Sequence, residues 1–294
     1  MTMNLNRFIS LILIFAALFQ ACSPSKKMAD KPLIINLDTL AVKEKDPVKP
    51  IYRASATRIN DIIHTKLEVS FDWNKKYLYG KETLTLKPYF YPTNILELDA
   101  RGMEIKEVAL LTDGSRKNLN YSYKNNTIHI ELDKVYSNSE VYQIFIDYIA
   151  KPDELEKGGG SVAIKDDKGL YFINADGKDK DKPQQIWTQG ETESNSAWMP
   201  TIDKPNERMT QEIFITTEDK YVTLSNGELI SVSSNGDGTH TDYWKMELPH
   251  APYLAMMAVG DFAIVKDKWR DKEVNYYVEK KYEPFARNIF GNTP

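Results

Sequence analysis

Apolar and polar residues alternate along most of the chain after residue 50, and this period of two restricts the possible folds more than any other feature. Successive side chains of a β-strand point to opposite faces of a sheet, so the alternation is typical of strands with one buried face. It occurs in the segments 63–71, 84–86, 128–132, 141–148, 213–215 and 221–224. From 51 to 150 the sequence has no amphipathic helical repeat of ten residues or more. The pattern predicts an all-β domain.

Short turn signals separate these predicted strands. They are Asp113-Gly114, Asn125-Asn126, Asn226-Gly227 and the run from Asn235 to Gly238. Asn and Gly tolerate the positive φ angles of tight hairpin turns, so sequential strands are expected to pair antiparallel. Apolar residues make up 41% of the 294 residues, which is enough for a sizeable buried core. The sequence therefore predicts an antiparallel β-sandwich or a large curved sheet.

The N-terminus has the organisation of an export signal. An apolar run from Phe8 to Phe19 is too short to span a membrane but typical of a secretory signal. Residues 18–22, Leu-Phe-Gln-Ala-Cys, resemble the lipobox of bacterial lipoproteins, in which the cysteine is lipidated. We predict a signal peptide at 1–22, lipidation of Cys22, and export to the periplasmic or cell-surface face of a bacterial membrane. The alternative is an ordinary cleaved signal that leaves Cys22 as a free thiol.

The remaining connecting segments are polar. Residues 23–50 are rich in Lys, Asp and Pro and are predicted to form a linker. Two charged loops, 151–168 with its Gly158–Gly160 run and 174–183, are long enough to carry binding groups on a sheet scaffold. The net charge is −4, and no block of Lys and Arg is interleaved with aromatic residues, so we expect no nucleic-acid partner.

Polar groups are most concentrated in residues 188–208, TQGETESNSAWMPTIDKPNER. We expect residues 191–199 to form a short helix that Pro200 ends, with Trp198 on its buried side. Trp187 and Trp198 are expected to hold the segment against the sheet. Taken alone, the Gln-Gly-Glu at 189–191 favours a turn with solvated side chains over a binding site.

The second half of this segment is predicted to support the first. Asp203, Pro205 and Arg208 suit a compact turn, in which Asp203 caps backbone N–H groups and Arg208 pairs with a carboxylate. This support would hold Gln189 and Glu191 outward. Two other side chains of the segment, those of Glu193 and Asn195, are expected to be solvated.

The order of these motifs resembles the N-terminal domain of the aminopeptidase N family of zinc metallopeptidases. The order Gln-x-Glu, an aromatic residue, Pro and Asp-x-Pro-Asn-x-Arg spans residues 189–208. Gly169-Leu170-Tyr171 resembles the short strand before that loop, and 221–227, Tyr-Val-Thr-Leu-Ser-Asn-Gly, resembles a strand and turn after it. Residues 244–246, 249–255 and 259–262 resemble the strand that closes the family's N-terminal domain. The resemblance covers about residues 60–265.

This resemblance implies a saddle-like antiparallel β-sandwich at 51–265 that lies beside a thermolysin-like zinc domain. It also implies that Gln189 and Glu191 bind the free α-amino group of a peptide, so that the expected partners are peptides with a free N-terminus. A carboxylate that faces an ammonium group gains a charge-assisted hydrogen bond, and this would favour peptide N-termini over internal peptide bonds.

The catalytic motifs of the family are absent from this sequence. It contains neither His-Glu-x-x-His nor Gly-x-Met-Glu-Asn, and its four histidines have no ligand-like spacing. His64 and His129 fall in strand patterns and are expected to be half-exposed. No Ser, Cys or Lys lies in a nucleophile motif. We therefore predict no catalytic and no metal-binding residue in this chain and no activity of the chain alone, with zinc bound in the full-length protein by ligands outside this chain.

The C-terminal residues 266–294 are predicted to begin the catalytic domain. Glu273 to Val278 has a strand pattern and Glu283 to Ile289 a helical one. Thr293-Pro294 is typical of a helix start, with Thr as the N-cap and Pro at the first helical position. We therefore expect a C-terminal catalytic domain that is missing from this sequence.

Three functions compete at this point. The first is the N-terminal part of an exported, lipid-anchored zinc metallo-aminopeptidase, a peptide hydrolase that releases N-terminal residues. The second is a non-catalytic, lipid-anchored β-sandwich that binds peptides or proteins. The third is a carbohydrate-binding sandwich, for which the aromatic residues Tyr89 and Tyr91 are the candidates.

Overall fold

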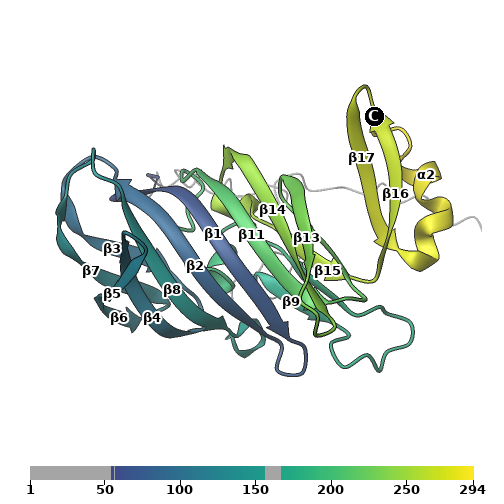
Figure 1. The fold of residues 1–294 in the computed structure, drawn as a ribbon, viewed down its shortest axis with the longest axis horizontal. Helices are drawn as coiled ribbons and strands as arrows, with labels where there is room; N and C mark the ends of the chain where they lie inside the picture. Colours follow the sequence, from purple (N-terminus) through teal and green to yellow (C-terminus); the bar gives the residue numbers. More distant parts are fainter. Residues whose placement is uncertain (1–53, 56, 156–166) are drawn as a thin grey trace, which may run out of the picture. The chain divides into compact units, whose positions relative to one another are not determined.

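The computed structural model describes residues 54–55, 57–155 and 167–294 (Figure 1). The predicted signal peptide with Cys22, the linker 23–50 and the glycines at 158–160 lie outside the described residues. Strands dominate, and α2 (Glu283–Phe290) is the only α-helix in the part of the chain that the structure describes. The predicted all-β class is confirmed. No helix of this part is long and apolar enough to cross a membrane.

An eight-stranded sheet forms the larger layer, with the strand order β13–β14–β11–β1–β2–β8–β4–β5 (Figure 1). Its strands are β1 (Asn60–Asp72), β2 (Tyr77–Pro88), β4 (Met103–Thr112), β5 (Ser115–Asn118), β8 (Tyr142–Ala150), β11 (Met209–Glu218), β13 (Glu228–Ser234) and β14 (Thr239–His250). Neighbours run antiparallel except β1 and β11, which are parallel. Because parallel strands start at the same end of a sheet, the segment that leads into β11 reaches the end where β1 begins.

The alternation in β1 is interrupted by a shift in register. Ile62 is fully buried and Ile63 is largely exposed, and the pairing with β2 shifts between Ile62 and His64. From Thr65 onward the inward positions are the odd-numbered ones, so Leu67 and Val69 are buried as their spacing predicts. One extra residue at this point of β1 shifts which positions face inward. Ile63 therefore lies on the other face of the strand from Leu67 and Val69.

Two smaller sheets cover the large one. The first has the order β12–β15–β10–β9, and the second has the order β3–β7–β6. Their strands are β3 (Thr93–Asp99), β6 (Asn120–Lys124), β7 (Thr127–Tyr136), β9 (Leu170–Ile173), β10 (Gln185–Thr188), β12 (Val222–Ser225) and β15 (Met257–Gly260). Leu84 of the large sheet, Ile130 of the three-stranded sheet and Val259 of the four-stranded sheet belong to the same buried cluster. The layers therefore share one core, which is the predicted sandwich.

The predicted turn residues lie at strand ends. The β4–β5, β6–β7, β12–β13 and β13–β14 connections contain the Asp-Gly, Asn-Asn, Asn-Gly and Asn-Gly-Asp-Gly signals. Positive φ angles occur in all of them, at Asp113, Gly114, Asn125, Asn126, Gly227, Gly236 and Gly238. Three of these connections are the predicted hairpins, whereas the Asn226-Gly227 turn leads from β12 in one sheet to β13 in another, so the hairpin expected there is wrong.

Short helices and one further hairpin complete the fold. The 3-10 helices are η2 (Pro152–Glu154), η3 (Asn195–Ala197), η4 (Pro252–Leu254) and η5 (Lys280–Tyr282). After β15, the strand β16 (Phe262–Trp269) pairs with β17 (Lys272–Glu279), and α2 follows. The strand at 273–278 and the helix from Glu283 are as predicted, whereas the sequence did not reveal β16 as a strand. Phe285 and Ile289 leave an exposed apolar face on α2.

Candidate functional site

The candidate site is the loop of residues 189–208, which connects β10 to β11. Gln189 follows β10 directly and is half-buried, and its backbone N–H donates to the carbonyl of Gly169 at 2.9 Å. Two residues on, the side chain of Glu191 is exposed. The loop therefore begins with a half-buried amide, which an exposed carboxylate follows two residues later.

The predicted short helix at 191–199 is wrong. Only Asn195–Ala197 form a single 3-10 turn, and Glu191 to Ser194 form turns, with the Ser194 N–H donating to the carbonyl of Gly190 at 2.9 Å. The physical reason is that Ser and Asn side chains compete with helical hydrogen bonds by bonding to nearby or distant backbone groups. Asn195 does this most completely.

Asn195 is fully buried, so the expectation that it is solvated is wrong. Its Nδ2 donates to the carbonyl oxygens of Pro252 at 2.6 Å and of Ala255 at 2.8 Å. Its Oδ1 accepts a hydrogen bond from Nε1 of Trp198 at 2.7 Å. One side chain therefore joins the loop to η4 and orients the buried tryptophan at the same time.

The two tryptophans near the loop differ in their surroundings. Trp198 is fully buried, and its carbonyl accepts a hydrogen bond from the hydroxyl of Tyr148 at 3.0 Å. Trp187 lies at the surface, and its ring stacks on that of Tyr171 with centroids 4.7 Å apart. Trp198 therefore anchors the loop in the core, whereas Trp187 packs on the neighbouring strand β9.

Asp203 ties the second half of the loop to the first. Its Oδ2 accepts the Ser196 N–H at 2.8 Å, and its own N–H donates to Oδ2 of Asp99 on β3 at 3.0 Å. Burial raises the pKa of the Asp203 carboxyl to about 6. The carboxyl is therefore an acceptor within the loop and is unavailable to a ligand in solution.

Arg101 braces the loop from the other side. Its backbone N–H donates to the carbonyl of Ser196 at 2.6 Å, and its guanidinium donates to Oδ2 of Asp167 at 2.9 Å and to the carbonyl of Glu193 at 3.3 Å. The hydroxyl of Ser194 also bonds to Asp167. These contacts fix the backbone immediately after Glu191.

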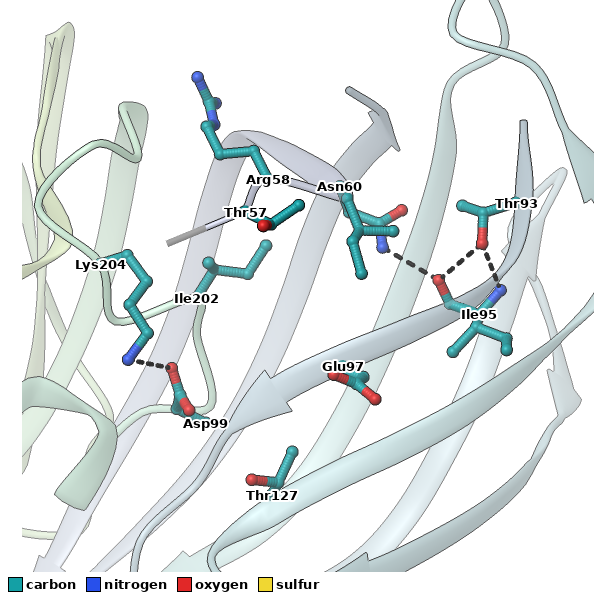
Figure 2. Close-up of a pocket in the computed structure, with 11 residues that line it drawn as sticks. Thr57, Arg58, Asn60, Thr93, Ile95, Glu97, Asp99, Thr127, Ile202 and Lys204 are labelled. Carbon is teal, nitrogen blue, oxygen red and sulfur yellow. Dashed lines mark hydrogen bonds and ion pairs between the residues drawn. The ribbon is translucent and has the colours of Figure 1, made fainter. Parts of the chain in front are cut away.

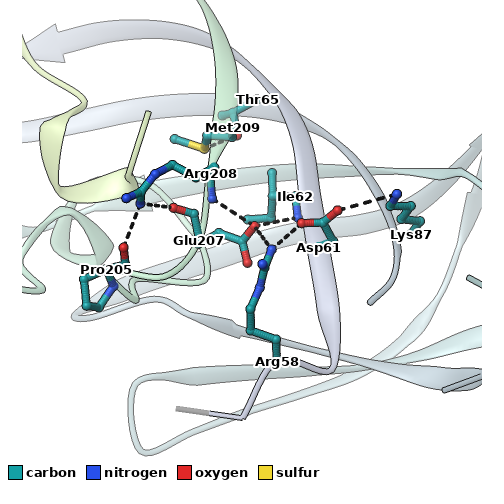
Figure 3. A network of polar contacts seen from close by, with 9 residues as sticks. All are labelled: Arg58, Asp61, Ile62, Thr65, Lys87, Pro205, Glu207, Arg208 and Met209. Carbon is teal, nitrogen blue, oxygen red and sulfur yellow. Dashed lines mark hydrogen bonds and ion pairs between the residues drawn. The ribbon is translucent and has the colours of Figure 1, made fainter. Parts of the chain in front are cut away.

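The end of the loop is held by a buried carboxylate that the sequence did not reveal (Figure 3). The side chain of Glu207 is fully buried, and its Oε1 accepts from Nη2 of Arg58 at 3.0 Å and from the N–H of Ile62 at 3.2 Å. Arg58 also contacts Asp61, whose carboxylate lies 3.8 Å from Nζ of Lys87. Arg208, expected to pair with a carboxylate, instead donates to the carbonyls of Pro205 and Glu207 at 2.7 and 2.8 Å.

Burial raises the pKa of Glu207 to about 7, although the nearby Arg58 guanidinium opposes this shift. A carboxyl group with a higher pKa in the folded protein holds its proton to higher pH there, so this group lowers the free energy of unfolding as pH rises between the two pKa values. Relative to Glu207→Gln, the wild type is expected to lose about 1–3 kcal/mol of stability between about pH 5 and pH 8. Urea unfolding at both pH values measures this.

The comparison with a variant cancels the effect of other titrating groups, because the partly buried His64 and the buried His250, whose pKa values burial lowers, are present in both proteins. Glu193→Gln, at an exposed position, is the matched control and should show no such change. A stability difference between wild type and Glu207→Gln that does not vary with pH would contradict the assignment.

No metal site is formed by the residues that the structure describes. Among them, no group of three or more His, Cys, Asp or Glu side chains could hold a metal ion. His64 and His129 are half-exposed on β1 and β7, as expected, with Nδ1 of His64 at 2.7 Å from Thr210 Oγ1 and Nδ1 of His129 at 3.0 Å from Glu97. The donor set thus does not fit the zinc that the resemblance implies, and zinc chemistry is not assigned to these residues.

A groove lies beside the second half of the loop, whereas Gln189 and Glu191 are in its first half (Figure 2). It has a volume of about 350 Å³, and its lining includes Ile202 and Lys204 of the loop and Glu97 and Asp99 of β3. Nζ of Lys204 lies 3.7 Å from Oδ2 of Asp99 and 2.6 Å from Oε2 of Glu193. Neither Gln189 nor Glu191 lines this groove. Lys204 and Asp99 of the lining therefore pair with each other, whereas Arg58 and Glu97 of the lining pair with residues outside it.

The fold and the braced polar loop define a β-sandwich domain whose β10–β11 loop carries a half-buried amide and an exposed carboxylate. Residues 61–254 match the model of the peptidase M1 N-terminal domain, and the chain belongs to this family. The resemblance to zinc aminopeptidases is confirmed at the level of the family.

Solved structures with this fold include an M1 zinc metallopeptidase and a hydrolase. An M1 zinc metallopeptidase from Deinococcus radiodurans superposes with a TM-score of 0.62 at 16% identity, over 77% of this chain and 48% of that one. Native yeast LTA4 hydrolase gives a TM-score of 0.61 at 19% identity, over 86% of this chain and 37% of that one. The chain thus spans about half the length of its structural relatives or less.

Two curated relatives are named as a transcription factor subunit and not as a peptidase. Transcription initiation factor TFIID subunit 2 of Danio rerio is 21% identical over 74% of this chain and 20% of its own length. The same subunit of Gallus gallus is 24% identical over 41% of this chain and 10% of its own length. The chain therefore spans a fifth or less of these relatives.

Proposed function

We propose that this chain supplies the loop that binds the substrate α-amine in an exported zinc aminopeptidase, which releases N-terminal residues from peptides. The observation that carries the proposal is the exposed carboxylate of Glu191, two residues after the half-buried Gln189, on a loop whose backbone is held by Arg101 and by the buried side chain of Asn195. Membership of the peptidase M1 N-terminal domain family supports the reaction class.

The chemistry of the loop is recognition. The Glu191 carboxylate accepts a charge-assisted hydrogen bond from the substrate ammonium, and the Gln189 amide can bond to the same end of the peptide. Because Asn195 and Asp203 brace the loop, the backbone that carries the carboxylate is pre-organised, and this lowers the entropy lost on binding. Zinc would activate water in the complete protein, and its ligands are proposed to lie outside this sequence, which contains no His-Glu-x-x-His.

Export and anchoring through Cys22 are part of the same proposal. Their support is the apolar run 8–19 followed by the lipobox-like residues 18–22. The partners proposed for the native protein are peptides with a free N-terminus, a membrane, and a C-terminal catalytic domain.

Replacing Glu191 with glutamine tests the amine-binding role in the native protein. The variant keeps the shape of the side chain and removes its charge, so kcat/KM for peptides with a free N-terminus should fall about 10- to 100-fold. Glu193→Gln is the matched control, because Glu193 is an exposed glutamate two residues along the same loop. Its kcat/KM should stay within about twofold of the wild type.

A second candidate function is a non-catalytic module that binds peptides or proteins. The observation that favours it is that two curated relatives similar to this chain are named as subunits of a transcription initiation factor. In that case the chain should bind peptides with a free N-terminus but not their N-acetylated forms in calorimetry, without hydrolysing either. Absence of binding to both forms would remove this candidate.

A further inference from the structure

Three consecutive aromatic residues are exposed in the connection between β2 and β3. Tyr89, Phe90 and Tyr91 lie between Pro88 and Pro92, and the side chains of Phe90 and Tyr91 are 64% and 77% exposed. The rings of Phe90 and Tyr91 contact each other edge to face, with centroids 4.9 Å apart. A single exposed aromatic residue is ordinary, but a contiguous group of them marks a surface that contacts a partner or a membrane.

The turn is itself well held. The N–H of Tyr89 donates to the carbonyl of Ile59 at 2.8 Å, and the guanidinium carbon of Arg58 lies 4.1 Å from the centre of the Tyr89 ring. Arg58 is in turn bonded to the buried Glu207. The aromatic residues are thus presented by a fixed turn.

Other exposed apolar side chains lie at the same end of the sandwich. Strand pairing places Pro88 opposite Asn60, Leu86 opposite Tyr142 and Thr93 opposite Tyr136. The residues next to these pairs include the exposed Ile59, Val135 and Val141. We call Ile59, Tyr89, Phe90, Tyr91, Val135 and Val141 the aromatic end.

Charges near the aromatic end are largely neutralised. Lys87 lies 3.8 Å from the carboxylate of Asp61, and Lys134 lies 2.5 Å from that of Glu140. The surface is therefore apolar with a paired, polar rim, and it has no excess of either sign to attract a nucleic acid or a highly charged protein. Exposed Tyr and Phe side chains on an apolar surface with a polar rim are typical of a boundary between an apolar phase and water.

The described chain also enters the fold at this end. Residues 57–59 lead directly into β1, whose first residue Asn60 pairs with Pro88 at the edge of the aromatic turn. A protein held by a lipid at its N-terminus would therefore be attached at the end that carries the exposed aromatic residues. A tether of this kind raises the effective concentration of the aromatic end at the membrane surface, so even a weak contact between the two forms.

We propose that the aromatic end inserts Phe90 and Tyr91 into the lipid–water interface of the membrane to which the chain is anchored. This inference rests on the proposed anchor at Cys22 but not on the aminopeptidase activity. The contact fixes which end of the sandwich faces the bilayer, with the β2–β3 turn against the lipid head groups.

Tryptophan fluorescence in vesicles tests the contact. The full chain carrying Phe90→Trp is reconstituted into phosphatidylcholine vesicles, with and without bromine on the acyl chains, and its emission is compared with that of the wild type, whose five tryptophans give the background. Val232→Trp, at an exposed apolar position of β13, is the matched control. We expect brominated lipid to lower the added emission of Phe90→Trp at least about twofold and to leave that of Val232→Trp unchanged.

Equal quenching at both positions would overturn the proposal. A chain that does not float with the vesicles would overturn it as well, because the anchor on which it rests would be absent. If the Phe90→Trp emission responds to soluble oligosaccharides and not to brominated lipid, the aromatic turn is a sugar-binding site instead. Peptide hydrolysis by the native protein is measured separately, so a failure of this contact is distinguishable from a failure of the proposed function.

Discussion

Replacing Asn195 with aspartate is expected to lower the free energy of unfolding by about 3–5 kcal/mol. The substitution keeps the size of the side chain but replaces the amide that donates to the carbonyls of Pro252 and Ala255 with an oxygen. Two carbonyl oxygens would then face a third oxygen at a fully buried position. Either a negative charge is buried without a counter-charge, with the Trp198 Nε1–H as its donor, or the carboxyl takes up a proton and satisfies only one carbonyl.

Urea unfolding measures this change, with Asn118→Asp as the matched control. Asn118 is exposed on the edge strand β5, so its substitution should alter stability by less than about 0.5 kcal/mol. Asn195→Asp should also weaken amine binding, because Asn195 fixes the loop that carries Glu191. A loss of stability at Asn195 no larger than at Asn118 would contradict the role of this side chain.

Replacing Gly169 with alanine is expected to destabilise the protein by about 2–4 kcal/mol. Gly169 has a φ of +68°, and an added Cβ would lie 2.0 Å from the carbonyl oxygen of Ser194 and 3.1 Å from Cβ of Ala197. The obstructing atom is backbone of the candidate loop, so the loop itself must move. The carbonyl of Gly169 also accepts the Gln189 N–H at 2.9 Å, so the displacement would reach the amine-binding residues.

Gly114→Ala separates the two causes of this loss. Gly114 has a φ of +77°, but an added Cβ would meet no atom within 4 Å. Its substitution should therefore cost only the conformational strain of about 1–2 kcal/mol. The additional loss of stability at Gly169, measured by thermal or urea unfolding, reports the contact with Ser194. Equal losses of stability at both glycines would show that this contact is unimportant.

The sheet layers could be predicted from the sequence because their signals are local. Alternation shows the buried face of a strand within a few residues, and Asn or Gly at a strand end marks a turn wherever the rest of the chain lies. Ile63 is an instructive exception, since the register shift that exposes it depends on pairing with β2. The parallel pairing of β1 with β11 has no local signal either, and it joins segments far apart in the chain.

The supports of the candidate loop could not be predicted, because their partners are distant in sequence. Asn195 and Glu193 look alike as polar residues of one turn-rich segment, yet one is fully buried and the other is exposed. The difference in burial arises because Asn195 bonds to backbone carbonyls in and directly after η4. One of these, the carbonyl of Ala255, is 60 residues further along the chain. Similarly, Glu207 is buried against Arg58, which is 149 residues away in the chain. The neighbouring Arg208 instead donates to carbonyls of its own loop.

Gln189 and Glu191 were identified through a family motif, and their role depends on exposure to a substrate. The comparison of kcat/KM for Glu191→Gln and Glu193→Gln in the native protein, on peptides with a free N-terminus, tests this role most directly. We expect a fall of about 10- to 100-fold at position 191 and none at position 193. Equal kcat/KM values in the two variants and the wild type would show that the loop does not bind the substrate amine.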